Sequence, residues 1–192
     1  MVMTREKTET GSPSRTVVLG LGNPVLRDDA VGLAVVVELR RLLVEDPIPG
    51  VDVLASTRAG FELIDLLHGY HRAVIVDCLQ QPTPTPGRVR RLQREDVAGS
   101  ARLVSVHEIS LDIAFRLAEQ MDIPMPTQLD IFAIEAADVT TLSEQMTPEV
   151  QASVLPLARE IHEDLKRRAP AIDPPDDEDF RQRRAFYAPP VD

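Results

Sequence analysis

Apolar and polar positions alternate along the chain in blocks that have the lengths of strands and helices. Short runs of apolar, often β-branched residues are typical of buried strands, and a weaker alternation is typical of an edge strand. Buried strands are predicted at residues 16–21, 51–55, 73–77 and 129–134, and an edge strand at 88–93. Apolar residues at helical spacing predict helices at 29–44, 60–67, 109–121 and 148–168. This alternation predicts an α/β fold, a three-layer sandwich in which a twisted, mostly parallel sheet of about five strands lies between helices.

The two ends of the chain lack this pattern. Residues 1–15 are polar and aperiodic, which predicts a disordered N-terminal tail. Residues 170–192 combine prolines with an acidic block, which oppose a long helix or strand and predict a solvated tail. As an alternative, the aromatic residues of this tail dock onto the domain or onto a partner; they are Phe180, Phe186 and Tyr187. One folded domain is therefore expected over residues 16–169.

Charge and cysteine content narrow the possible partners and the compartment. The formal net charge is −10, and so acidic a surface argues against nucleic acid or an anionic membrane as the main partner. The single cysteine excludes an internal disulfide and indicates a reducing compartment, the cytoplasm. No apolar run approaches the roughly 20 residues of a membrane span, so none is predicted. We also expect no secretory signal in the polar residues 1–15.

Acidic residues gather where the predicted strands end. Residues 16–32 read as a strand, a glycine-containing turn and a helix start, and open α/β sheets bind ligands at the carboxyl ends of their strands. Asp28 and Asp29 follow this first strand, and Asp77 ends the third, where an acid after Val-Ile-Val is unusual on burial grounds. If these strands are neighbours, Asp29 and Asp77 emerge together, and His107 approaches from the loop before the third helix. Two carboxylates and an imidazole suit nickel or zinc and leave coordination positions for a substrate.

Each of these residues also has a purely structural interpretation. Asp29 is compatible with a helix-start acid, although Asp28 fits that role, or a capping role, better. Asp77 fits a cap of the following turn, and His107 fits a polar residue at a helix N-terminus. Cys78 is interpreted as a small buried residue rather than a nucleophile, because no second thiol and no evident base accompany it.

Five motifs follow one another at characteristic intervals across residues 16–168. They are Gly20-Leu-Gly-Asn-Pro-Val-Leu-Arg-Asp-Asp-Ala-Val-Gly32, Ala59-Gly-Phe-Glu-Leu63, Val74-Ile-Val-Asp77, His107 ahead of a helix, and Met146-Thr-Pro148. This ordered series resembles the hydrogenase maturation proteases. These endopeptidases trim the C-terminal extension of the nickel–iron hydrogenase large subunit.

The resemblance carries expectations about the site and the partners. It implies a twisted sheet between helices and places the metal ligands of the family on Asp29, Asp77 and His107, which would be the catalytic residues as well. It implies nickel, supplied by the substrate precursor rather than held by the enzyme. The implied partner is a nickel–iron hydrogenase large-subunit precursor, cleaved once nickel has been inserted. We expect the protein to work as a cytoplasmic monomer.

The chain departs from the family pattern at two places. Ser56-Thr57-Arg58 stands where the family usually has a glycine pair, so Arg58 is expected to narrow the cleft or to contact the substrate. Glu135 follows the strand 129–134 and can enter the same sheet edge, but Ala136 stands where the family often has proline. These differences leave open which hydrogenase is processed.

Other classes of protein fit parts of the sequence. Peptidyl-tRNA hydrolases also begin with a strand ending in Gly-Leu-Gly-Asn-Pro, but they need a catalytic histidine soon afterwards and a basic face, whereas the first histidine here is His68. A dinucleotide-binding module is disfavoured because Val25 occupies the third glycine position of the Rossmann fingerprint. The residues do not distinguish a protease from a non-catalytic, nickel-dependent chaperone of the precursor. His-Glu-x-x-His is absent, so ordinary zinc-peptidase chemistry has no support.

Overall fold

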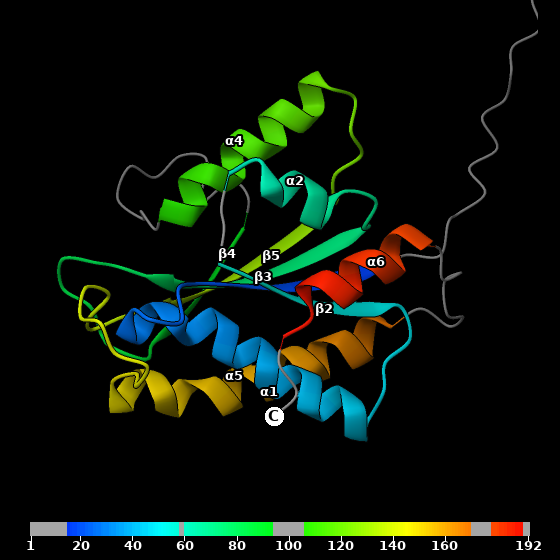
Figure 1. Ribbon diagram of the computed structural model, residues 1–192. Helices are drawn as coiled ribbons and strands as arrows, with labels where there is room; N and C mark the ends of the chain where they lie inside the picture. The colour runs from blue at the N-terminus through cyan, green and yellow to red at the C-terminus, as the bar shows by residue number, and fades with distance from the viewer. Residues whose placement is uncertain (1–14, 58–59, 94–105, 170–177, 190–192) are drawn as a thin grey trace, which may run out of the picture.

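The computed structural model describes residues 15–57, 60–93, 106–169 and 178–189, with residues 106–110 as backbone only. The tail expected at the N-terminus lies outside these ranges except for Arg15. Within them, no helix has the length and apolar character needed to cross a bilayer. The elements, shown in Figure 1, are β1 Thr16–Leu21, the 3-10 helix η1 Arg27–Ala30, α1 Val31–Glu45, β2 Val51–Ser56, α2 Glu62–Leu67, β3 Arg72–Leu79, β4 Val89–Leu92, α4 Val106–Gln120, β5 Gln128–Glu135, α5 Pro148–Arg168 and α6 Glu178–Tyr187.

The strands form one five-stranded sheet in the order β2-β1-β3-β5-β4. The pairs β1–β2, β1–β3 and β3–β5 are parallel, and β4 pairs antiparallel with β5. β4 therefore lies at an edge of the sheet, as the imperfect alternation at residues 88–93 predicts. The predicted α/β class, with a mostly parallel sheet of five strands between helices, is confirmed.

Helices cover both faces of the sheet, with α1 and α5 on one face and α2 and α4 on the other (Figure 1). The central strand β3 is buried along its whole length, and its side chains alternate between two cores. Ile75 belongs to the core beneath α2 and α4, whereas Val76 and Cys78 belong to the core beneath α1 and α5. The same alternation sends Asp77 towards the α2–α4 side, opposite to Cys78.

Two glycines of the opening motif let α1 lie directly against the sheet. A Cβ atom on Gly32 would come within 2.2 Å of the Leu21 carbonyl oxygen and 2.4 Å of the Val76 carbonyl oxygen. A Cβ atom on Gly20 would meet the Gly32 carbonyl oxygen at 2.4 Å. Because backbone atoms cannot yield as a flexible side chain can, these positions exclude larger residues. The glycines therefore fix where α1 begins relative to the ends of β1 and β3.

Three helix starts differ from their predicted positions, and one of them is α2, which begins at Glu62 rather than at residue 60. The helix predicted from residue 29 becomes α-helical only at Val31, and Asp29 lies in the preceding 3-10 turn. The helix predicted over 109–121 begins at Val106, so His107 lies in the first turn of α4 rather than in the loop before it. Local hydrogen bonds and tertiary contacts decide where a helix begins, and apolar periodicity does not record them.

The tail after residue 170 was expected to be solvated, but it contains the helix α6. This helix packs against the domain beside β2 (Figure 1). Phe180 is 9% exposed, and its ring meets Tyr70 edge to face with centroids 4.9 Å apart. The Tyr187 hydroxyl donates a hydrogen bond to Glu62 Oε1 at 3.0 Å. Phe186, in contrast, is 76% exposed. Docking of the tail aromatics thus holds for two of the three residues.

A helix can form here because the prolines lie outside it. The stretch 178–187 contains none, and Pro189 follows its end. Glu178 and Asp179 occupy the first turn, where the helix dipole favours negative charge. The acidic block of the tail therefore supports the start of α6 instead of preventing a helix.

Candidate active site

The carboxyl ends of β1 and β3 bring two of the predicted site residues to one edge of the sheet. The two strands are parallel neighbours, with Gly20 opposite Val76. Asp77 belongs to β3 and is 1% exposed, whereas Asp29 lies in η1 just after β1 and is half-buried. Both residues therefore lie at the same edge of the sheet, while the site that they would form together stays a prediction.

A hydrogen bond between the two segments makes the link direct. The Cys78 thiol, next in sequence to Asp77, donates to Asp29 Oδ1 at 2.8 Å. Asp77 Oδ1 accepts from the Cys78 backbone N–H at 2.8 Å. Burial raises the pKa of the Cys78 thiol far above its usual range, and the nearby carboxylates of Asp77 and Asp29 raise it further. The thiol stays protonated and acts as a donor, which agrees with its interpretation as a buried residue and not a nucleophile.

The backbone of Asp29 is held from the glycine turn. Gly22 has φ +150°, and a Cβ atom there would lie 2.0 Å from the Asp29 carbonyl oxygen. The same oxygen accepts a hydrogen bond from the Asn23 N–H at 3.3 Å, and the Asp29 N–H donates to the Leu26 carbonyl at 2.8 Å. The turn 22–26 therefore packs directly against the backbone of Asp29, and a side chain at position 22 would push Asp29 away from the turn.

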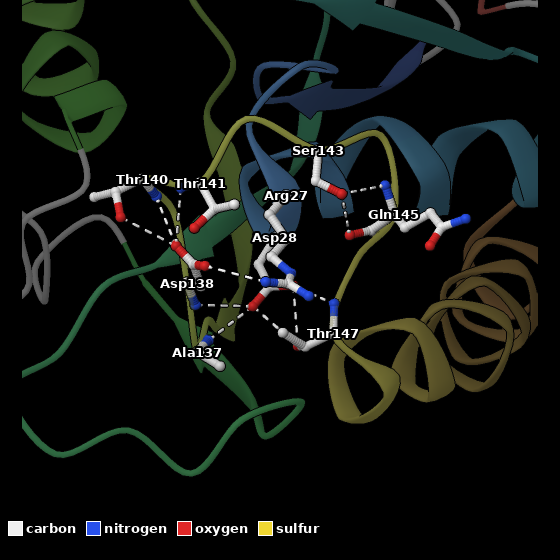
Figure 2. A network of polar contacts seen from close by, with 9 residues as sticks. All are labelled: Arg27, Asp28, Ala137, Asp138, Thr140, Thr141, Ser143, Gln145 and Thr147. Carbon is white, nitrogen blue, oxygen red and sulfur yellow. Dashed lines mark hydrogen bonds and ion pairs between the residues drawn. The ribbon is translucent and has the colours of Figure 1, made fainter.

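Asp28 has a different structural role from the one expected. It does not cap its own helix but lies fully buried between two parts of the β5–α5 connection (Figure 2). Its Oδ2 accepts from the N–H groups of Ala137 and Asp138 at 2.9 and 3.0 Å. Its Oδ1 accepts from the N–H and hydroxyl of Thr147 at 2.7 and 2.9 Å. One carboxylate thus fastens η1, which carries Asp29, to the start of α5.

A second carboxylate extends this network (Figure 2). Asp138 Oδ1 accepts from the N–H groups of Thr140 and Thr141, each at 3.0 Å, and Asp138 Oδ2 lies 3.4 Å from Arg27 Nη1. Hydrogen bonds from Thr141 and Thr140 hold the pKa of Asp138 well below its usual range. The loop after β5 is therefore tied to η1 through both Arg27 and Asp28.

Glu135 reaches the end of its strand but has a structural role. It is 1% exposed, and its carboxylate accepts from the Thr85 N–H and from Arg90 Nε, each at 2.6 Å. Burial would raise the pKa of Glu135, but these hydrogen bonds outweigh burial and lower it. The carboxylate holds the proline-rich turn 81–87 and β4 in place.

The third predicted ligand is placed only by its backbone. His107 lies in the first turn of α4, and its side chain is outside the described residues. Arg58, the residue expected to narrow the cleft, is outside them as well. Among the side chains that the structure describes, no three of the metal-ligating types form a group that could hold an ion. The set of Asp29, Asp77 and His107 therefore stays a prediction.

Sequence reasoning did not find the Asp28 network or the Cys78–Asp29 hydrogen bond. Strand alternation offered a signal for Cys78, because a residue after a site acid on a central strand points to the opposite face, here towards α1. For Asp28 the only signal was a pair of adjacent acids, and such a pair does not indicate which distant residues either carboxylate contacts.

Comparisons with known proteins agree on one family. The profile described as HycI, hydrogenase maturation protease, matches residues 33–164 of this chain. Asp77 and His107 lie within the matched range, and Asp29 lies just before it. The hydrogenase 2 maturation protease of Escherichia coli strain K12 is 27% identical over 150 residues, which cover 77% of this chain and 88% of the relative. The HupD hydrogenase expression/formation protein of Bradyrhizobium diazoefficiens is 25% identical over 146 residues, 74% of this chain and 73% of the relative.

Solved structures share the fold. The HybD hydrogenase maturating endopeptidase from E. coli superimposes with a TM-score of 0.67 at 23% identity, over 82% of this chain and 98% of the other. The [NiFe] hydrogenase maturation protease HybD from Thermococcus kodakarensis gives a TM-score of 0.58 at 26% identity, over 79% of this chain and 98% of the other. The profile match covers well over half of the sequence. The chain therefore belongs to the hydrogenase maturation protease family of endopeptidases.

Proposed function

We propose that the protein removes the C-terminal extension of a nickel–iron hydrogenase large-subunit precursor after nickel insertion, and that it recognises the bound nickel. The observation that carries this proposal is the convergence of Asp29 with the Asp77–Cys78 pair of β3 at one sheet edge, in a chain of the maturation protease family. Nickel is here part of the substrate. We further propose that the enzyme acts as a cytoplasmic monomer.

The proposed ligands of the nickel in the precursor are Asp29, Asp77 and His107. Carboxylate and imidazole donors suit a borderline divalent ion and bind it at about 2.0–2.2 Å. The topology supports the inclusion of His107. α4 leads through residues 121–127 into the amino end of β5, so its opposite end, which carries His107, lies towards the carboxyl edge of the sheet. Asp77 belongs to the strand face that α4 covers.

Two routes to hydrolysis fit these residues. In the first, the nickel orients the scissile peptide and polarises its carbonyl, or lowers the pKa of a bound water. In the second, one of the two carboxylates takes a proton from the attacking water as general base. In both routes the carboxylates must stay close together, and the Cys78–Asp29 hydrogen bond supports that arrangement. The Asp28 network does not contact the substrate in this proposal; it positions η1, the turn that carries Asp29.

The function is tested by incubating the protein with nickel-loaded precursor and measuring the precursor's mass. The loss of a C-terminal peptide is expected with loaded precursor, and no loss is expected with nickel-free precursor. An intact mass accompanied by a stable complex would identify a chaperone and contradict the proposed proteolysis.

Variants of the site separate its residues from the rest of the acidic surface. Asp29→Asn, Asp77→Asn and His107→Ala are each expected to leave a folded protein that does not cleave. The amide variants keep an oxygen that accepts the hydrogen bonds of Cys78, so folding is preserved while charge is removed. Glu38→Gln is the control, because Glu38 pairs with Arg41 on the outer surface of α1. Normal cleavage by any one of the three site variants would remove that residue from the site.

A further inference from the structure

A small cavity opens at the amino-terminal edge of the sheet, away from the candidate active site. It has a volume of about 320 Å³ and is lined by Thr16, His71, Arg72, Gln128 and Arg168. Arg72 is the first residue of β3, whereas Asp77 lies near its end. The five residue steps from Arg72 to Asp77 span about 17 Å of extended strand. The two sites are therefore at opposite ends of β3 and on separate surfaces.

A buried arginine in this cavity has an unsatisfied donor group. Arg72 is 3% exposed, its Nε and Nη2 donate to Asp130 Oδ2 at 3.1 and 2.6 Å, and its Nη2 also donates to Asp164 Oδ2 at 2.6 Å. Its Nη1 is buried and has no hydrogen-bond partner. Leaving a charged donor unpaired in the interior costs free energy, and such groups in native proteins call for an explanation. Because Nε and Nη2 are committed to carboxylates, Nη1 is the one nitrogen of this guanidinium without a hydrogen-bond partner.

The charges around the cavity favour an anion. Asp130 pairs with Arg72 and Arg91, and Asp164 pairs with Arg72 and with two arginines at the end of α5. Burial would raise the pKa of both carboxyls, but the hydrogen bonds from Arg72 outweigh it and lower both values. Both groups are therefore ionised, and four arginines face two buried carboxylates and the exposed Glu160 near Arg91. Within this set of ion pairs, the arginines outnumber the carboxylates.

We propose that this cavity binds a small oxyanion, a phosphate or carboxylate group. Arg72 Nη1 would donate to it from the buried part of the cavity, and the Arg168 guanidinium from the exposed part. Gln128 and Thr16 add an amide and a hydroxyl, neutral groups that suit the remaining oxygens of such a ligand. A cation is disfavoured by the two arginines, and an apolar group would leave Nη1 unsatisfied. The site is independent of the proposed endopeptidase activity.

Two neighbouring arginines provide a matched pair of variants. Arg167 and Arg168 both pair with Asp164, at 2.9 and 3.3 Å, and both are partly exposed. Only Arg168 lines the cavity. Arg168→Gln and Arg167→Gln therefore remove the same charge from the same helix end, but only the first removes a cavity donor. Gln128→Ala is a second variant that changes the cavity without changing the charge.

The experiment is calorimetric titration of the full chain with inorganic phosphate, and separately with citrate, against chloride at equal ionic strength. We expect saturable binding of phosphate or citrate by the wild-type protein, and the arm with the lower Kd identifies the preferred oxyanion. Arg168→Gln should weaken binding about tenfold or more, and Arg167→Gln by less than about twofold. At about five times Kd the melting temperature of the wild-type protein should rise by about 2–4 °C.

Three outcomes would overturn the proposal. The first is absence of saturable binding by either oxyanion. The second is an equal loss of binding in Arg167→Gln and Arg168→Gln, which would indicate attraction by bulk charge instead of a site. The third is unchanged binding by both Arg168→Gln and Gln128→Ala. Cleavage of the precursor is measured separately, so failure of either proposal does not affect the other.

Discussion

The Cys78 thiol donates a hydrogen bond to Asp29 Oδ1 at 2.8 Å, and this single contact joins the turn after β1 to the end of β3. Through its side chain Cys78 holds Asp29, and through its backbone N–H it donates to the other site carboxylate, Asp77. Burial and the adjacent negative charges raise the pKa of the thiol, so donation persists across the physiological pH range. The contact therefore fixes the orientation of Asp29.

Replacing Cys78 tests whether the residue positions Asp29 or reacts itself. Cys78→Val keeps an apolar side chain of similar size but removes the donor, so cleavage should fall roughly 10- to 100-fold as Asp29 loses its orientation. Cys78→Ser keeps a donor and should cleave within roughly threefold of the wild-type rate, measured as kcat at saturating precursor. If the serine variant were as inactive as the valine variant, the sulfur itself would be the reacting group and the positioning role would be wrong.

Asp28 should matter for stability more than its surface neighbours do. Asp28→Ala leaves the N–H groups of Ala137, Asp138 and Thr147 without their acceptor, and we expect a loss of about 3–5 kcal/mol in the free energy of unfolding. Thr147→Ser keeps both donors to Asp28 and should cost less than about 1 kcal/mol. Urea denaturation followed by circular dichroism measures both. Near-equal stability of Asp28→Ala and the wild-type protein would contradict the importance of the network.

The close contact between α1 and the sheet can be tested with glycine variants. Gly32→Ala would place a methyl group 2.2 Å from a backbone oxygen, so α1 must move away and unfolding free energy should fall by at least about 3 kcal/mol. Gly60→Ala is the control. It has a positive φ of 78° but nothing within 4 Å of the added atom, so only backbone strain of about 1–2 kcal/mol is expected. If Gly32→Ala left the free energy of unfolding unchanged, the close contact between α1 and the sheet would not be needed for stability.

Acid should destabilise the protein through the carboxylates around Arg72. In the folded protein the hydrogen bonds from Arg72 hold the pKa values of Asp130 and Asp164 below 3.8, the ordinary value of an aspartate. Their contribution to stability is therefore present above about pH 5 and is lost as the pH falls through 3.8 towards the folded values. Asp164→Asn should lower stability at pH 7 and flatten the acid limb of the stability curve, whereas Glu38→Gln should leave the curve unchanged. A wild-type curve that is flat between pH 5 and pH 3 would contradict this linkage.

The sequence was most informative where the pattern is set by burial. β3 reads as an unbroken apolar run because helices cover both of its faces, and its position beside β1 follows from the parallel α/β pattern. The sheet edge shared by Asp29 and Asp77 could be predicted for the same reason, since parallel strands end on one side.

Contacts between segments far apart in sequence could not be read in this way. Asp28 binds Thr147 across more than a hundred residues, and no local periodicity encodes that distance. The helix α6 was not predicted because the proline and acid content was considered over the whole tail, whereas the prolines lie outside the helical stretch. The contact between Phe180 and Tyr70 that holds this helix exists only in the folded domain. The start of α4 was misplaced for a similar reason, because helix starts depend on local contacts.

The most direct test of the account is an anomalous-scattering crystal structure of the protein with nickel and a peptide from the precursor's C-terminal region. The account predicts one nickel ion within about 2.0–2.2 Å of carboxylate oxygens from Asp29 and Asp77 and of a ring nitrogen of His107. Nickel bound elsewhere, or bound at this edge without both carboxylates, would contradict it.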